Sequence, residues 1–194
     1  MRLGKLQEKI EAVFRSADLA QRRPALGANF ESSLAGVYVI GDLAGAPVIK
    51  LAMEQGQALI EKLAALPDAR GDNPEVYDIL VVGAGAAGLN AALAAKDKGL
   101  HTLVLEKSKI ANTIENFPQG KWVYAEPDET PPRGKLWLDG ARKEDLIRRW
   151  HQIIRDHQLE VHSEEGLQSL QRQKDGSFRV VSEKREYRAR RVVL

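Results

Sequence analysis

Three glycines and one carboxylate are the residues whose types and spacing best suit chemistry on a ligand. Gly83, Gly85 and Gly88 form a G-x-G-x-x-G pattern, and Glu106 follows about 20 residues later. In this pattern the first glycine permits a tight turn, the second lets the backbone approach a pyrophosphate, and the third lets a helix pack closely on a strand. A carboxylate at the later position accepts hydrogen bonds from ribose hydroxyls. The spacing predicts a dinucleotide site, and the alternative is a glycine-rich turn that binds nothing.

The elements that must hold these residues lie on either side of the glycines. The apolar run Ile79–Val82 predicts a strand that ends at the first glycine. An alanine-rich segment after the glycines predicts a helix, which Gly99 ends. A second apolar run, Thr102–Leu105, predicts the strand that delivers Glu106. The strand, helix and strand occur in the register that a dinucleotide fingerprint requires.

Three more residues are expected at this site because of their places on these elements. Ala86 and Ala87 would form the first turn of the helix, whose unpaired N–H groups and positive dipole end would face phosphates. Lys107 follows the second strand, and loops that leave the carboxyl ends of parallel strands line the ligand crevice.

A second stretch places another carboxylate after another strand. The β-rich run Val37–Ile40 ends in Gly41 and Asp42, so a buried strand would deliver a carboxylate close to a ligand. There Asp42 could accept hydrogen bonds from ligand hydroxyls. The alternative is that Asp42 only caps a turn or helix.

A helix is expected directly after this carboxylate. The segment Val48–Leu66 has helical spacing, and Pro47 suits the first turn of a helix, where its missing N–H is no loss. Val48 and Ile49 would then lie at the positive end of the helix, which stabilises negative charge on a ligand.

Composition narrows the function classes. The chain has 194 residues, 43% of them hydrophobic and 29% charged, a net charge of +2 and no cysteine. The lack of cysteine excludes disulfides, thiolate metal sites and a C-x-x-C redox pair within these residues. The four histidines show no metal-ligand spacing, and we find no acid–base pair or nucleophile. The sequence therefore predicts neither a metal site nor a catalytic side chain.

Charge and hydropathy also bear on partners and location. A net charge of +2 gives no broad electrostatic case for nucleic acid. No apolar stretch reaches the roughly 20 residues needed to span a bilayer, and the N-terminus lacks the apolar region of a signal peptide. We expect no nucleic-acid partner, no membrane partner and a cytoplasmic protein.

The remaining segments show helical, linker or strand character. Leu6–Leu19 and Arg142–His157 have helical spacing, and Pro67–Glu75 is a polar connector that contains proline and glycine. Alternation predicts a short strand followed by a β-meander, at Leu159–Val161, Leu167–Gln173, Ser177–Glu183 and Glu186–Leu194. The chain ends inside the last of these strands.

Four motifs resemble those of one enzyme family, the thioredoxin-reductase-like FAD-dependent pyridine nucleotide oxidoreductases, with the bacillithiol-disulfide-reductase-like branch as the nearest. They are the glycine pattern with Glu106, the Gly36–Asp42 segment, Glu115–Pro118 and Arg190–Leu194. The resemblance covers roughly residues 26–194. It implies an α/β, Rossmann-like FAD-binding domain with a parallel sheet, helices and a small antiparallel β-meander.

The resemblance also implies roles for particular residues. Asn116, in the segment that resembles Glu-Asn-Tyr-Pro, would lie near the flavin of a bound FAD. Asp42 would hold its ribityl–phosphate portion. Leu194 would end a strand that leads into a glycine turn at the pyrophosphate.

The order of the motifs departs from the family pattern. Residues 1–66 resemble the C-terminal half of an FAD domain and residues 76–194 its N-terminal half, joined by the 67–75 linker. No second G-x-G-x-x-[GA] marks an NAD(P)H domain. Either the chain is a piece of a longer protein, or the halves form one permuted domain. We expect them to pack together, within one chain or between two chains of a homodimer.

Three functions follow from these observations. The first is the FAD-binding portion of an oxidoreductase that takes electrons from NAD(P)H through a domain absent from this chain. The second is a Rossmann domain that binds NAD(H). The third is a non-catalytic module of a larger redox protein.

Overall fold

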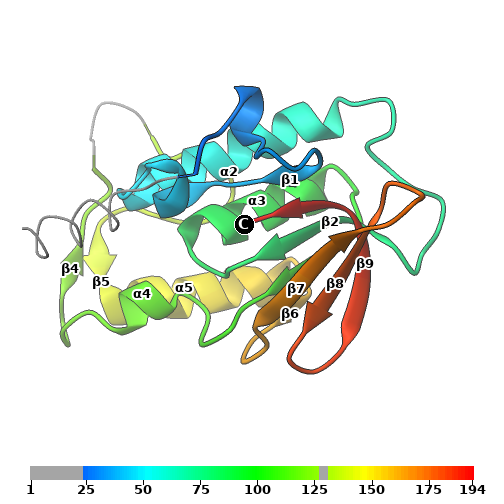
Figure 1. The fold of residues 1–194 in the computed structure, drawn as a ribbon. Coiled ribbons are helices and arrows are strands. Elements are labelled where there is room, and N and C mark those ends of the chain that lie inside the picture. The colour runs from blue at the N-terminus through cyan, green and yellow to red at the C-terminus, as the bar shows by residue number, and fades with distance from the viewer. Residues whose placement is uncertain (1–23, 127–130) are drawn as a thin grey trace, which may run out of the picture.

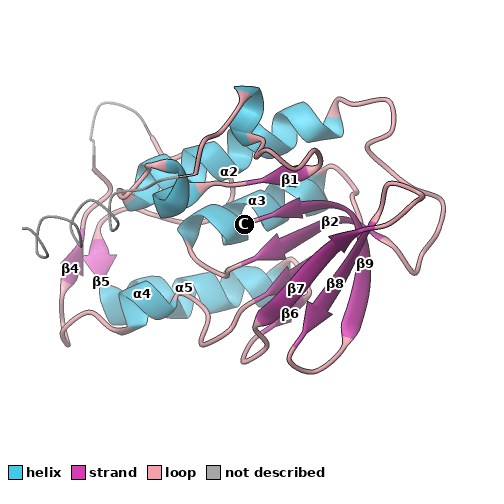
Figure 2. Cartoon of the chain, viewed as in Figure 1, coloured by secondary structure: helices cyan, strands magenta, loops and turns pink. Residues whose placement is uncertain are grey.

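The computed structural model describes residues 24–126 and 131–194. The helix expected at Leu6–Leu19 lies outside these residues. In the described part, helices pack on a largely parallel sheet, which makes an α/β fold (Figures 1 and 2). The sheet contains β1 (Val37–Tyr38), β2 (Tyr77–Val82), β3 (Thr102–Leu105), β6 (Val161–His162), β7 (Leu167–Arg172), β8 (Phe178–Ser182) and β9 (Glu186–Val193).

The remaining elements are short strands and helices. A second, two-stranded sheet pairs β4 (Trp122–Val123) with β5 (Ala141–Arg142). The α-helices are α2 (Ile49–Ala64), α3 (Ala86–Asp97), α4 (Asn112–Glu115) and α5 (Lys143–Asp156), and the 3-10 helices are η1 (Ala28–Phe30) and η2 (Gly41–Ala44).

The strands β2 and β3 form the parallel pair that the two apolar runs predict. Ile79 pairs with Thr102 and Val82 with Leu105, so both strands end side by side. Alternate residues of β2 enter two different cores, because neighbouring side chains of a strand point to opposite faces. Ile79 packs with α2, α3 and α5, whereas Leu80 packs with β8 and β9.

The predicted β-meander is confirmed, and its last strand, β9, pairs both within the meander and within the parallel sheet. At its start, β9 pairs antiparallel with β8, and Phe178 lies opposite Ala189. Towards its end, β9 runs parallel between β2 and β1, and Val37 pairs with Val192. The strand order is β6-β3-β2-β9-β8-β7, with β1 also on β9 (Figure 1). One strand therefore joins the meander to the parallel sheet.

The helices α2 and α3 cross at very close range (Figure 1). A Cβ atom built on Gly56 would lie 2.4 Å from the carbonyl oxygen of Ala87, a distance that side chains do not adopt. Glycine at this position lets the two backbones approach. The crossing fixes residues 49–64 against the helix that follows the glycine pattern.

The structure corrects several predicted element boundaries, and the strand expected at Val37–Ile40 is the shorter β1. Helix α2 begins at Ile49 with Val48 as its N-cap, so Pro47 lies before the helix and not in its first turn. Gly45 adopts a φ of +92° and ends η2, which inserts a turn between Asp42 and the helix. The strand expected at Leu159–Val161 is β6, Val161–His162, and Leu159 is instead a buried residue between α5 and β6.

Candidate dinucleotide-binding site

A pocket of about 410 Å³ lies where β2 ends, between the two stretches that the sequence singles out. From one stretch its wall takes Gly41, Asp42 and Ile49, and from the other it takes Gly83, Gly85, Ala86, Ala87 and Gly88. These groups are about 40 residues apart along the chain and meet because β1 and β2 both flank β9.

The three glycines of the pattern have different surroundings. A Cβ atom built on Gly83 or Gly85 would meet no atom within 4 Å, so the backbone there borders open space. Gly83 also has a φ of +109°, which favours glycine, and this conformation makes the turn that leaves β2. A Cβ atom on Gly88 would lie 2.0 Å from the carbonyl oxygen of Gly83, so that glycine serves packing. The open backbone fits a ligand that must approach closely, as a pyrophosphate does.

The N-terminus of α3 provides the electrostatic part of this wall. Gly85 is the N-cap, and no side chain makes a capping hydrogen bond there. The first-turn residues Ala86, Ala87 and Gly88 line the pocket, and first-turn N–H groups have no partner inside their helix. Together with the helix dipole they favour an anion.

The structure places Glu106 behind the glycine turn and not on the pocket wall. The residue is 8% exposed. Oε2 accepts a hydrogen bond of 2.8 Å from the backbone N–H of Ala84, and Oε1 accepts one of 2.8 Å from that of Ser108. A carboxylate oxygen has two lone pairs, so each of these oxygens can accept a further hydrogen bond. Glu106 thus also holds the turn that carries the glycine pattern.

Three other predicted residues lie outside the pocket. Lys107 and Asn116 line a separate hollow of about 520 Å³, together with Ser108 and Glu115. Val48 is the N-cap of α2 and is 39% exposed. The structure therefore brings the glycine loop and the Gly41–Asp42 turn together, and does not place these three residues on the pocket wall.

A comparison with known families identifies the family of the chain. The family model described as pyridine nucleotide-disulphide oxidoreductase matches residues 80–194, which is more than half of the chain. The chain belongs to this family. The resemblance to pyridine nucleotide oxidoreductases is thereby confirmed, and three of the four motifs lie within the matched residues.

Relatives and solved structures of this family are longer than the chain. A thioredoxin reductase from Ureaplasma parvum is 49% identical over 51 residues, 23% of this chain and 16% of that protein. Ferredoxin–NADP reductase 2 from Listeria monocytogenes is 22% identical over 124 residues, 63% of this chain and 35% of that protein. The structure of bacillithiol disulfide reductase from Staphylococcus aureus matches with a TM-score of 0.52 and 23% identity, over 61% of this chain and 37% of that one. The chain thus spans less than half of each.

The structure adds pocket residues that the sequence did not predict. They are apolar or small side chains from several elements: Ile40, Leu43, Ala46, Thr113, Ile114, Phe117 and Trp150. Leu194, which the resemblance places at the end of a strand that leads to the pyrophosphate, also lines the pocket. Phe117 follows Asn116 in one of the four family-like motifs, so that motif was a usable signal. Trp150 reaches the pocket from α5 and is fully buried, and no local pattern distinguishes it from an ordinary core residue.

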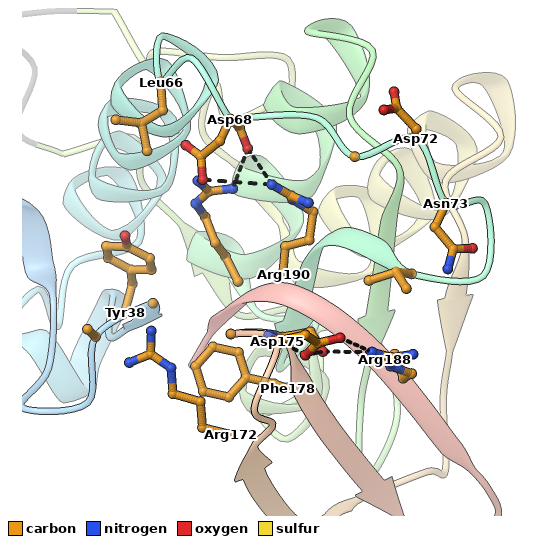
Figure 3. A pocket seen from close by; sticks show the side chains of 17 residues that line it. Tyr38, Leu66, Asp68, Asp72, Asn73, Arg172, Asp175, Phe178, Arg188 and Arg190 are labelled. Atoms are coloured by element: carbon orange, nitrogen blue, oxygen red, sulfur yellow. Dashed lines mark hydrogen bonds and ion pairs between the residues drawn. The ribbon is translucent and has the colours of Figure 1, made fainter.

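A second hollow, of about 760 Å³, lies at the opposite end of β2, near Val76 (Figure 3). Four arginines line it, and β9 supplies Arg188, Arg190 and Arg191. Arg191 lies 2.7 Å from a carboxylate oxygen of Asp68, and Arg188 pairs with Asp175. These pairs attach the 67–75 connector and the β7–β8 turn to β9, so we interpret the hollow as a structural junction.

We expect Asp68→Asn to lower the free energy of unfolding by about 1–2 kcal/mol. The side chain of Arg191 is 9% exposed, and the substitution leaves its guanidinium buried without a carboxylate partner. Urea unfolding measures the change. Asp175→Asn is the matched control, because its partner Arg188 is 47% exposed and a surface pair contributes about 0–1 kcal/mol. Equal losses for the two variants would contradict the prediction.

Two other kinds of site have no support in the described residues. Within residues 24–126 and 131–194, no group of three or more acidic or histidine side chains is arranged to hold a metal ion. No helix in this part of the chain is both long enough and apolar enough to cross a membrane.

Proposed function

We propose that the chain is the FAD-binding portion of an NAD(P)H-dependent flavoprotein oxidoreductase. The observation that carries the proposal is the pocket between the open glycine loop at Gly83–Gly85 and the Gly41–Asp42 turn. The glycine loop forms the first wall of this pocket, and the Gly41–Asp42 turn forms the second wall. A domain that binds NAD(H) alone needs the first wall but not the second. The names of the relatives, a thioredoxin reductase and a ferredoxin–NADP reductase, support a redox function.

Each wall would hold a different part of the cofactor. The first-turn N–H groups of α3 would bind the pyrophosphate, and Glu106 would accept hydrogen bonds from the adenosine ribose through its remaining lone pairs. Asp42 is exposed beside the pocket and would accept hydrogen bonds from the ribityl hydroxyls. The N-terminus of α2, with Val48 and Ile49, would stabilise negative charge on the ligand. When bound, FAD would supply the hydride chemistry.

The electron donor would reach this pocket from outside the chain. We propose that NAD(P)H binds to a separate domain, because no second glycine fingerprint occurs in the sequence. Residues 1–66 and 76–194 would then be two halves of one FAD domain, joined by residues 67–75. The pairing of β1 with β9 supports association of the halves. The same pairing between two chains would give a homodimer, which light scattering distinguishes from a monomer.

We expect the purified chain to bind FAD and to show flavin absorption between about 350 and 500 nm. Parallel calorimetric titrations with FAD and NADH test the proposal, and FAD should bind more tightly because it contacts both walls. The chain alone should oxidise NADPH only slowly, even with FAD bound. No uptake of FAD, or tighter binding of NADH, would overturn the proposal.

A further inference from the structure

Residues 161–166, which comprise β6 and the loop after it, are hydrogen-bonded to the main chain around Glu106. The backbone N–H of Glu106 donates to the carbonyl of His162 at 2.9 Å, and the N–H of Glu165 donates to the carbonyl of Glu106 at 2.8 Å. The N–H of Glu164, the residue before Glu165, donates to the carbonyl of Ser108 at 3.0 Å. These three bonds fix the backbone that carries the Glu106 side chain.

A buried carboxylate attaches this loop to the β-meander. Glu165 is 1% exposed, and its Oε1 accepts hydrogen bonds from the Ser182 hydroxyl at 2.5 Å and the Tyr187 hydroxyl at 2.7 Å. Burial opposes ionisation of Glu165, but the two hydroxyls and the nearby Arg185 outweigh it and hold its pKa below the usual value. A buried carboxylate is retained only where such partners exist. Glu165 thus connects β8 and β9 to the loop.

Tyr187 contacts two residues of the loop. Its hydroxyl oxygen lies 2.8 Å from Nδ1 of His162. The hydroxyl donates its proton to Glu165, and its oxygen can accept a hydrogen bond from Nδ1 of His162 in the tautomer that carries the ring proton there. One hydroxyl on β9 therefore fixes both ends of the segment that is bonded to Glu106.

The backbone conformation of Glu164 in this loop depends on these contacts. Glu164 adopts a φ of +54°, a left-handed conformation that costs a non-glycine residue free energy, so the surrounding contacts must hold it. Without them the loop would relax, and the bonds from Glu164 and Glu165 to the Glu106 strand end would weaken. The side chain of Glu106 would then lose its fixed position behind the glycine turn.

We propose that Glu165 and Tyr187 are positioning residues for Glu106, so that the β-meander sets how well the chain binds the adenosine ribose of its cofactor. This inference rests on the proposed function, since it assigns Glu106 to the ribose. Neither residue touches the pocket. Their effect should therefore fall on the adenosine half of the ligand and not on the flavin half.

Tyr187→Phe tests the inference, because it removes the hydroxyl and keeps the ring. We expect the variant to bind FAD and ADP about tenfold more weakly, and FMN within about twofold of the wild-type chain. FMN lacks the adenosine half and ADP lacks the flavin half, so the pair separates positioning from general weakening. Flavin fluorescence measures FAD and FMN binding, and calorimetry measures ADP binding.

Two further variants show whether a change in affinity comes from the contacts of Glu165 or from a general effect on the β-meander. Glu186→Gln removes the exposed ion pair between Glu186 and Arg179 on the same two strands and should change none of the three affinities. Ser182→Ala removes the other donor to Glu165 and should shift the affinities as Tyr187→Phe does, which keeps the test valid if one variant unfolds. Equal losses for FAD and FMN, or no loss in either variant, would overturn the inference. Failure of the wild-type chain to bind FAD would instead overturn the proposed function.

Discussion

Gly85→Val should keep the fold and weaken FAD binding at least about 100-fold, a change of about 2.7 kcal/mol. Gly85 has a φ of −84° and a ψ of −173°, which any residue adopts, and its built Cβ meets no atom within 4 Å. The valine side chain therefore causes no strain but occupies the space that a pyrophosphate needs. Loss of glycine at an N-cap should lower stability by no more than about 1 kcal/mol. Flavin titration and thermal unfolding measure the two effects separately.

Gly27→Val is a matched control for this substitution. Gly27 is also an N-cap, that of η1, with a φ of −79° and a ψ of −167°. Its built Cβ would make an ordinary contact of 3.6 Å with the carbonyl oxygen of Glu31, away from the pocket wall. FAD affinity should be unchanged in this control. If Gly85→Val bound FAD as the control does, the glycine loop would not be the pyrophosphate site.

Local sequence patterns were sufficient to predict the helices and strands around the glycine pattern and in the β-meander. The strand, helix and strand around the glycines form as β2, α3 and β3, and Gly99 ends the helix with a φ of +69°. The β-meander forms over the predicted strand ranges, with Asp175-Gly176 and Lys184-Arg185 in the turns between the strands. In these segments the buried side chains recur with the period of a strand or of a helix, so the spacing of apolar residues along the sequence predicts the type of element.

The position of β9 in the sheet and the hydrogen bonds of Glu106 depend on contacts between segments far apart in the chain, which the sequence does not show. Alternation predicts a strand at Glu186–Leu194, and the family resemblance directs its end towards the pyrophosphate, but neither predicts that the strand lies between β1 and β2. The sequence also favoured a ribose-facing Glu106 without showing that its carboxylate would be bonded to Ala84 and Ser108. Such contacts depend on where two turns meet in space, and a single sequence gives no measure of that.

Gly56→Ala should have the largest effect on the association of the two pocket walls. In an exposed helix this substitution would be stabilising by about 1 kcal/mol, since alanine has the higher helix propensity. Here the new Cβ would lie 2.4 Å from the carbonyl oxygen of Ala87 and 3.0 Å from the N atom of Ala91. Both are backbone atoms, so α2 must move away from α3, and overpacking of this kind costs about 1–3 kcal/mol or more. We expect a net loss of about 2 kcal/mol.

The same shift should weaken FAD binding, because α2 holds the second wall directly. The side-chain oxygen of Gln55 accepts a hydrogen bond of 2.8 Å from the backbone N–H of Gly41, so a displaced α2 moves the Gly41–Asp42 turn away from the glycine loop. Urea unfolding and FAD titration of Gly56→Ala measure both effects. Gln57→Ala, one residue along the helix, removes only an exposed hydrogen bond to Glu61 and should change stability by about 0.5 kcal/mol or less. If Gly56→Ala were as stable as this control and bound FAD as well, the close crossing of α2 and α3 would not be what aligns the two walls.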